Sequence, residues 1–195
     1  IQYVYNTRKY GIQYKRNSDM ETDLPKIYGQ GRHPKDNGKN YMTVFTDSDY
    51  AADESKRSTQ GSIVFMNGGP ISWSSVLGKT ICLSTCEAEV MAAVAASKEA
   101  IHLKLLLGEL GVNHEKLIIE EDNSACIAQA KGGLRFIRKA KHYQIALRYI
   151  QKLHVDGEVD FNYCETSEQI ADLFTKALDE PKFTYFRDKI MHLSA

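Results

Sequence analysis

The chain has 195 residues and a mass of 22.0 kDa, a size that suits one domain or one domain with a tail. Its 25 lysines and arginines balance 25 aspartates and glutamates, so the formal net charge is zero. This balance excludes a strongly basic nucleic-acid coat protein and an acidic disordered tail. Hydrophobic residues make up 43% of the chain, enough for a sizeable core, and no apolar run is long enough to cross a membrane.

The first 40 residues differ in composition from the rest. The start lacks an initiator Met and the apolar core of a signal peptide, so we expect a fragment of a longer chain. Residues 17–40 are polar and contain Pro25 and Pro34, as in a linker or a surface loop. We therefore divide the chain into a tail and linker, residues 1–40, and one compact domain, residues 41–195.

The segments between residues 41 and 83 predict strands. Residues 41–47 form an apolar, β-branched run, and residues 58–66 and 71–75 flank a turn at residues 67–70, which indicates a strand followed by a hairpin. Trp73 is expected to pack in the core. Residues 79–83 predict a further short strand.

Helical signals begin at Ser84. Ser84 and Glu87 form an S-x-x-E capping box that opens a long helix, and this helix should end at Leu110 before Gly111. The later pattern predicts strands over residues 116–122 and 158–164, and helices behind Asn123, over 141–154, over 170–178 with Thr166 and Gln169 as its cap, and over 181–193. This order of elements predicts a mixed α/β fold around one sheet.

The four cysteines have spacings that fit neither a zinc site nor a CxxC redox motif: Cys82, Cys86, Cys126 and Cys164. A disulfide scaffold is typical of small secreted domains rather than of a chain with this apolar content. We therefore expect free thiols in a reducing compartment.

Four acids lie at element ends or on early helical turns, among apolar neighbours: Asp47, Glu89, Asp122 and Asp172. Isolated carboxylates are costly to bury, and a shared cation removes that cost. Oxygen ligands suit Mg²⁺, and two such ions about 3.5–4 Å apart would activate a water and stabilise a leaving oxygen. Taken singly, each acid also fits a helix cap or a solvated strand end, and sequence spacing alone does not join the four.

Five blocks of sequence occur in a set order: TDSDYAAD followed by KRSTQG, GGPISWSS, LSTCEAEVMAA, EDNSACIAQA and EQIADLFTKAL. Together they resemble the ribonuclease H domain of copia-type LTR retrotransposon Pol polyproteins, from about Phe45 to the C-terminal segment. The N-terminal YNTRKYGIQY resembles the end of the reverse transcriptase that precedes ribonuclease H in this family.

The resemblance implies a ribonuclease H-like mixed five-stranded sheet flanked by helices. It also implies that Asp47, Glu89, Asp122 and Asp172 are catalytic and bind two Mg²⁺ ions, for which Mn²⁺ would substitute. Glu89 is preferred to Glu87 because the second acid of EAE matches the family's catalytic one. The implied reaction is two-metal hydrolysis of the RNA strand of RNA–DNA hybrids during reverse transcription. It would take place in a cytoplasmic virus-like particle, beside the polymerase domain of the same polyprotein.

One departure from the family concerns charge near these acids. Glu120 and Glu121 precede Asp122, where the family usually has an apolar residue or Cys. Strand alternation would place Glu120 on the face of Asp122, adding negative charge near the metals.

Residues 131–152 contain seven basic residues and no acid. With the family in view we interpret this stretch as a patch that contacts phosphates, although a solvated helix face balanced by acids elsewhere has the same pattern. The candidate contacts in it are Arg135, Arg138, Lys139, Lys141 and His142. His142 also fits a half-buried side chain of an amphipathic helix.

Asn123 and Ser124 follow the third acid at the start of a predicted helix. Both can donate to a phosphate or to a 2′-hydroxyl, or can simply cap the helix.

Two other functions stay open. The chain is compatible with a catalytically decayed module that binds hybrids or is purely structural, although the four intact acids argue against it. An integrase-like DNA strand-transfer domain on the same scaffold is the second alternative. Such domains typically use three acids, so dependence of activity on Asp172 separates them from ribonuclease H.

Overall fold

The computed structural model describes residues 10–14, 40–112, 116–132 and 143–191. Its elements are β1 (Met42–Asp49), β2 (Thr59–Met66), β3 (Gly69–Leu77), α3 (Thr85–Glu109), β4 (Leu117–Glu121), α4 (Ser124–Lys131), α5 (Gln144–Val155), β5 (Val159–Tyr163), the 3₁₀ helix η3 (Ile170–Phe174) and α6 (Glu180–Met191). Within these ranges, no helix combines the length and the apolar character needed to cross a membrane.

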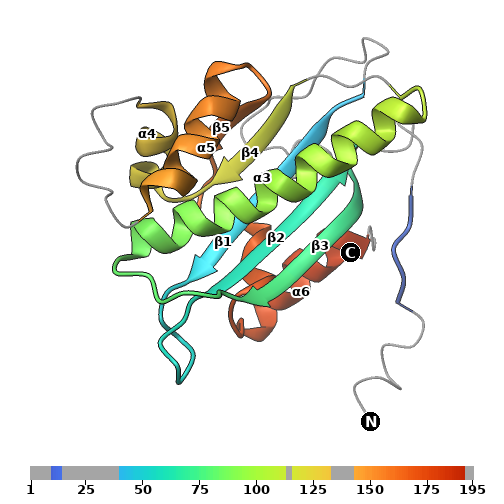
Figure 1. The fold of residues 1–195 in the computed structure, drawn as a ribbon. Helices are drawn as coiled ribbons and strands as arrows, with labels where there is room; N and C mark the ends of the chain where they lie inside the picture. Colours follow the sequence, from blue (N-terminus) through green and yellow to red (C-terminus); the bar gives the residue numbers. More distant parts are fainter. Residues whose placement is uncertain (1–9, 15–39, 113–115, 133–142, 192–195) are drawn as a thin grey trace.

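The five strands form one sheet in the order β3-β2-β1-β4-β5 (Figure 1). β2 is antiparallel to both β1 and β3, whereas β4 is parallel to both β1 and β5. Asn67 and Gly68 connect β2 to β3 with positive φ angles of 50° and 86°, as a type I′ hairpin turn requires. The predicted mixed five-stranded α/β fold is confirmed.

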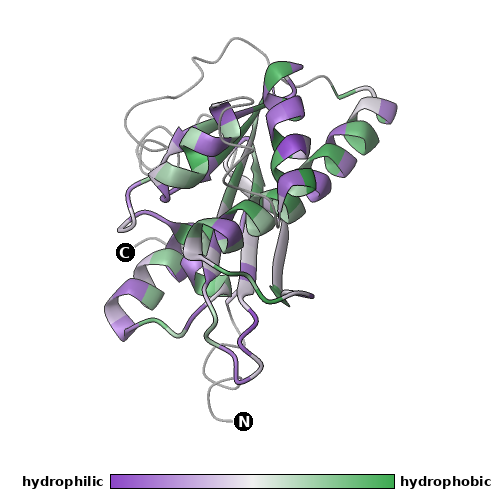
Figure 2. Ribbon diagram, turned by 60° about the vertical axis from the view of Figure 1, so that its left-hand side comes forward, coloured by the Kyte–Doolittle hydropathy of each residue, from purple (hydrophilic) through white to green (hydrophobic). Residues whose placement is uncertain are grey.

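Helices cover both faces of the sheet (Figure 1). α3 crosses one face, with α4 and α5 beside it, and packs on a core that includes Val44 and Ile119. η3 and α6 lie on the opposite face, over a smaller core that includes Phe45, Phe65 and Phe186. Neighbouring strand residues alternate between these cores, as Val44 and Phe45 do. Figure 2 shows the helices carrying hydrophilic and hydrophobic residues side by side, with hydrophobic residues along the strands between them.

The predicted limits of α3 are confirmed. The capping box differs in one bond, because the Glu87 carboxylate accepts from the N–H of Leu83 and not from that of Ser84. The Ser84 hydroxyl accepts a hydrogen bond from the N–H of Glu87 (3.1 Å), and the Glu87 carboxylate accepts one from the N–H of Leu83 (2.8 Å). At the other end, Leu110 is the C-cap and Gly111 has a φ of 75°, the left-handed conformation that ends many helices.

The prediction of a strand over residues 79–83 is wrong, because these residues form a loop between β3 and α3. The third strand of the sheet is β3, which continues the hairpin to Leu77. Directly after it, the N–H of Gly78 donates to the carbonyl of Ser58 (2.8 Å), and the chain then leaves the sheet edge on its way to α3.

The helix predicted over residues 170–178 with a Thr166 cap is also wrong. In its place, Gln169 caps η3, a 3₁₀ helix of five residues. The Gln169 side chain accepts from the N–H of Ala171 (3.3 Å) and donates to the carbonyls of Thr46 (3.0 Å) and Glu120 (3.4 Å). These bonds tie the start of η3 to the sheet.

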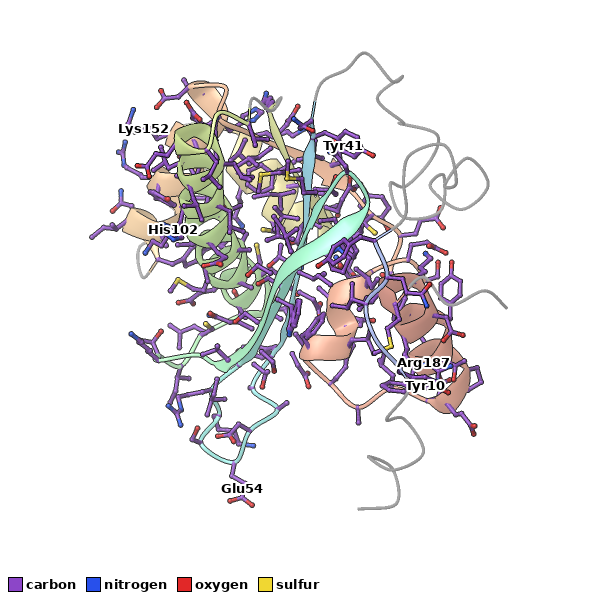
Figure 3. The ribbon with its side chains drawn as sticks, turned by 90° about the vertical axis from the view of Figure 1, so that its right-hand side faces the viewer. Tyr10, Tyr41, Glu54, His102, Lys152 and Arg187 are labelled. Atoms are coloured by element: carbon purple, nitrogen blue, oxygen red, sulfur yellow. The ribbon has the colours of Figure 1, made fainter. Side chains whose placement is uncertain are left out.

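Residues 10–14 lie along the face that carries α6. Figure 3 shows Tyr10 next to Arg187, whose guanidinium carbon is 4.9 Å from the centre of the Tyr10 ring. The Tyr14 hydroxyl donates to the carbonyl of Pro70 (2.8 Å), and the Tyr14 ring lies where a side chain at Gly69 would stand.

A mostly apolar cavity of about 320 Å³ lies between this segment, the sheet and α6. Ile12, Trp73 and Phe183 are among the residues that line it. Trp73 is 54% exposed, so the prediction that it packs in the core is wrong. The reason is that β3 is an edge strand of the sheet, where a side chain has neighbours on fewer sides.

Candidate metal centre

Three carboxylates from three elements meet at the edge of the sheet that is formed by the carboxyl ends of β1 and β4. Asp47 lies near the end of β1, Glu89 in the first turns of α3, and Asp122 directly after β4. One carboxylate oxygen of each lies within 4.8 Å of the other two. β1 and β4 are parallel neighbours, so their carboxyl ends share this edge, which is where open α/β sheets usually bind ligands.

Burial controls the charge of these acids. Asp47 is 3% exposed and Glu89 is 6% exposed. Burial raises the pKa of Asp47 to about 6. Burial, followed by the charges of Asp47 and Asp122, raises the pKa of Glu89 to about 9. In the protein without metal, Glu89 is therefore protonated at neutral pH.

Thr175 and Lys176, directly after η3, contact Asp47. The Thr175 hydroxyl donates to the Asp47 carboxylate, and the Lys176 ammonium lies 3.6 Å from Oδ2 of Asp47. Both groups partly offset the rise in the pKa of Asp47 that burial causes. Burial lowers the pKa of Lys176, but its contacts with Asp172 and Asp47 outweigh this and leave that pKa above its usual value.

Asp172 lies beside the three close carboxylates and is held by two lysines. It is fully buried in η3, with Oδ1 2.7 Å from the ammonium of Lys176 and Oδ2 2.6 Å from that of Lys182. Its charge still reaches the other acids, since it contributes to the raised pKa of both Asp47 and Glu89. The structure thus brings three of the four predicted acids into ligand distance and places the fourth next to them.

Two further acids, Glu120 and Glu121, directly precede Asp122 at the end of β4. Glu120 accepts a hydrogen bond from the side chain of Asn162 (3.2 Å). Burial, followed by the charges of Glu120 and Asp122, raises the pKa of the Cys164 thiol to about 12. Glu121, which sequence reasoning did not single out, is fully buried, and burial followed by the charge of Glu89 raises its pKa well above the usual value.

Asn123 caps α4. Its side-chain oxygen accepts hydrogen bonds from the N–H groups of Ala125 and Cys126, both at 3.0 Å. This bonding fixes the chain immediately after Asp122. Ser124, the first residue of α4, is exposed. Contact of Asn123 or Ser124 with a nucleic acid stays a prediction.

The predicted phosphate-contacting residues lie outside the described part of the chain: Arg135, Arg138, Lys139, Lys141 and His142. Their role stays a prediction. Two described lysines of the same basic stretch have acidic partners. Lys131 lies 3.2 Å from Asp160, and Lys152 lies 2.5 Å from Asp156. At its two ends the stretch is therefore balanced by acids.

The three close carboxylates fit a hard divalent cation. All the donors are oxygens, which is the ligand type that Mg²⁺ and Mn²⁺ prefer. Oε2 of Glu89 is buried and has no hydrogen-bond partner among the described residues. A buried, unsatisfied carboxylate oxygen is costly, and a cation bound there would remove both this cost and the repulsion from Asp47 and Asp122.

Sequence reasoning missed three residues that contact the acids: Thr175, Lys176 and Lys182. It named Gln169 as a cap, but it did not predict the hydrogen bonds of Gln169 to the carbonyls of Thr46 and Glu120. One signal was available for Lys176, since it follows Asp172 at the i,i+4 spacing of an ion pair. The contact of Thr175 with Asp47 spans 128 residues of sequence, and no local pattern reports such a contact.

No protein-family model matches the chain. Over 150 residues the chain is 33% identical to the Retrovirus-related Pol polyprotein from transposon TNT 1-94 of Nicotiana tabacum, which covers 76% of this chain and 11% of that protein. Over 151 residues it is 32% identical to the corresponding polyprotein from transposon RE1 of Arabidopsis thaliana, which covers 76% of this chain and 10% of that protein. The chain thus spans about a tenth of the length of these curated relatives.

Among solved structures, the fold is similar to that of LC11-RNase H1, isolated from compost by a metagenomic approach. The TM-score is 0.55 at 14% identity, over 69% of this chain and 92% of that one. LC11-RNase H1 in complex with an RNA/DNA hybrid gives a TM-score of 0.50 at 12% identity, over 69% of this chain and 93% of that one. At such low identity the similarity shows the fold alone.

Proposed function

Since the chain belongs to the copia-type retrotransposon Pol polyproteins and folds as their ribonuclease H domain, we propose that it hydrolyses the RNA strand of RNA–DNA hybrids. The observation that carries the proposal is the convergence of Asp47, Glu89 and Asp122 at one sheet edge, within 4.8 Å of one another. A ribonuclease H fold without such a group of acids would lack a place for the metal that phosphodiester hydrolysis uses.

Asp47, Glu89 and Asp122, with Asp172 beside them, are the proposed ligands of two Mg²⁺ ions. When bound, such ions activate a water and stabilise the leaving oxygen of a phosphodiester. Glu89 has to release its proton to act as a ligand, because a carboxylate binds metal in its ionised form. The Thr175 hydroxyl fixes the orientation of the Asp47 carboxylate.

The proposed substrate is the RNA–DNA hybrid rather than a particular sequence. Proteins distinguish a hybrid from duplex DNA by its 2′-hydroxyls and groove shape, so cleavage should be nearly independent of sequence. The hybrid bound to LC11-RNase H1, which shares the fold, supports this choice. Asn123 and Ser124 beside Asp122, together with the basic stretch that contains Arg138 and Lys139, are the proposed contacts to the substrate.

The proposed setting is reverse transcription in a virus-like particle. The matched part of this chain covers only 11% and 10% of the two relatives, so the domain would act as one part of a polyprotein. Its proposed partner there is the polymerase domain of the reverse transcriptase, which produces the RNA–DNA hybrid that this domain would cut.

The decisive experiment is cleavage of a hybrid with an end-labelled RNA strand, in Mg²⁺ and in EDTA, beside matched single-stranded RNA, duplex RNA and duplex DNA. We expect Mg²⁺-dependent fragments of the RNA strand in the hybrid alone. Glu89→Gln is the matched inactive control, because it keeps the shape of a side chain that is already neutral without metal. Hybrid binding without cleavage in Mg²⁺ and Mn²⁺ would favour the decayed module.

Asp172→Asn separates the proposal from an integrase-like domain. Loss of hybrid cleavage with a retained circular dichroism spectrum is the expected result for a site of four acids. Full activity of this variant, or cutting of duplex DNA by the wild type, would favour the integrase-like alternative.

A further inference from the structure

Two described lysines, Lys176 and Lys182, lie near Asp47 and Asp172, and they differ in which of the two acids they contact. Lys182 contacts Asp172 (2.6 Å) and the carbonyl of Thr166 (3.2 Å). Lys176 contacts Asp172 (2.7 Å) and also lies 3.6 Å from Asp47. Within the described part of the chain, Lys176 is thus the residue whose ammonium lies between two of the proposed metal ligands.

The position of Lys176 is fixed by its neighbours. Asp172 and Lys176 are four residues apart, and the N–H of Lys176 donates to the carbonyl of Asp172 (3.2 Å), which keeps one helical turn through this point. Thr175 binds Asp47 from the preceding position. The Lys176 side chain is 37% exposed, so it has a path to solvent, whereas that of Asp172 is fully buried.

We propose that Lys176 is the built-in counter-cation of this site: its ammonium compensates Asp47 and Asp172 in the metal-free protein, and a divalent cation that binds Asp47 displaces it. The inference rests on the metal site of the proposed function. It assigns Lys176 as a positioning residue that sets how tightly the metal binds.

The physical reason is competition between two cations for the same carboxylates. An opposite charge within a few ångström favours the ionised form of a carboxylate, so the tethered ammonium helps the metal-free protein to keep its site assembled. The same charge opposes an incoming divalent cation, because like charges at a few ångström repel. Removing the ammonium should therefore lower the stability of the metal-free protein and increase its affinity for metal.

Calorimetric binding of Mn²⁺ and of Mg²⁺ to the whole chain, with melting curves in EDTA, tests the assignment in three variants. Lys176→Met keeps the length and loses the charge, and we expect a dissociation constant at least about fivefold lower than in the wild type, as for a typical coupling between sites. Its melting temperature in EDTA should fall. Lys176→Arg keeps the charge and should restore the wild-type dissociation constant.

Lys182→Met is the matched control. It removes an ammonium that contacts Asp172 and leaves the contact of Lys176 with Asp47. We therefore expect less stability in EDTA and a clearly smaller gain in metal affinity than in Lys176→Met, which removes the ammonium from both acids. Equal metal affinity in wild type and Lys176→Met would overturn the inference and leave the proposed function standing. An equal gain in both Met variants would also overturn it, by showing a general charge effect. Absence of Mn²⁺ binding in the wild type and in every variant would instead overturn the metal site itself.

Discussion

At the scale of single residues, the site is a set of carboxylates that the fold buries at a cost. Asp47, Glu89 and Glu121 are all under a tenth exposed, and burial raises the pKa of each. The compensation comes from a hydroxyl and a lysine on one side of Asp47, and from protonation at Glu89. A metal ion that binds this site would therefore release the proton of Glu89 and displace the ammonium of Lys176.

Asp47→Asn should abolish hydrolysis and leave the fold intact. The amide keeps the size of the carboxylate and still accepts from Thr175, but it loses the charge that holds a cation. We expect hybrid cleavage to fall at least about a hundredfold, equivalent to roughly 2.7 kcal/mol of transition-state stabilisation. Single-turnover rates measure this, and a circular dichroism spectrum equal to that of the wild type is the control. A variant that cuts hybrid at nearly the wild-type rate would show that Asp47 is not a ligand.

The pKa of Glu89 predicts how the stability of the metal-free protein depends on pH. The unfolded chain releases this proton near pH 4.5, whereas the folded chain holds it up to about pH 9. Between these values the folded state binds the extra proton, so its stability falls as the pH rises, by up to about 1.4 kcal/mol per pH unit.

Melting curves in EDTA from pH 5 to pH 9 measure this dependence. Glu89→Gln should flatten it, because the amide does not ionise, while Asp47 and Glu121 keep part of the slope. With saturating Mg²⁺ the slope should decrease or reverse, since the metal binds the ionised form. A pH dependence that is the same in the wild type and in Glu89→Gln would contradict the raised pKa.

At the scale of elements, the contact of η3 with β2 places Asp172, Thr175 and Lys176 against β1. Gly61 of β2 pairs with Asp47 and makes this contact possible. A Cβ at Gly61 would stand 2.6 Å from Cγ2 of Thr175 and 2.9 Å from the carbonyl oxygen of Ala171. Neither distance is tolerable, and the second involves backbone, so η3 would have to move.

Gly61→Ala should therefore damage the site from β2, the strand next to β1. We expect a loss of about 1–3 kcal/mol in the free energy of unfolding, as for overpacked cores, together with reduced hybrid cleavage. Gly108→Ala in α3 is the matched control, because a Cβ there meets nothing within 4 Å, and it should stabilise by about 0.5–1 kcal/mol. Urea unfolding measures both variants. A Gly61→Ala protein as stable as the wild type would show that η3 yields easily.

The same elements show what the sequence could predict. The Asn67–Gly68 turn and the Ser84 cap are determined by residues within a few positions, and both predictions are confirmed. η3 depends on Gln169 bonding to the carbonyl of Thr46, 123 residues away, so its local pattern suggested an ordinary helix with a Thr166 cap. Tertiary hydrogen bonds decided that element, and sequence periodicity does not report them.

The candidate site likewise has one part that the sequence predicts and another that it does not. Asp47 and Asp122 end parallel strands, so a correct strand assignment already places them at one edge of the sheet. The ion pairs of Asp172 depend on where Lys182 of α6 lies relative to η3. The resemblance to a known family predicted the four acids. It did not predict that Asp172 forms ion pairs with Lys176 and Lys182.

At the scale of the whole molecule, a chain of zero net charge has to separate an acidic metal site from a basic contact surface for nucleic acid. The prediction that residues 131–152 supply this surface is tested by reversing two charges, Arg138→Glu with Lys139→Glu. Hybrid binding should weaken and its salt dependence should flatten, because fewer counterions are released.

The single-turnover cleavage rate at saturating protein should change little in this variant, since neither residue is a proposed metal ligand. Binding measured from 50 to 200 mM salt gives the slope. A slope equal to that of the wild type would show that the stretch is only a solvated surface. A collapse of the saturated rate with unchanged binding would place these residues in the catalytic site.

The packing of residues 10–14 makes the solubility of a shortened protein depend on where it is cut. A fragment that begins at residue 40 keeps every carboxylate of the site but loses Ile12 from the wall of the cavity and the Tyr14 ring from the surface of the hairpin turn. Trp73, already half exposed, and the mostly apolar cavity of about 320 Å³ would then face water. Contiguous exposed apolar surface promotes self-association. Aggregation, detectable by light scattering, would therefore appear in such a fragment before any loss of its chemistry.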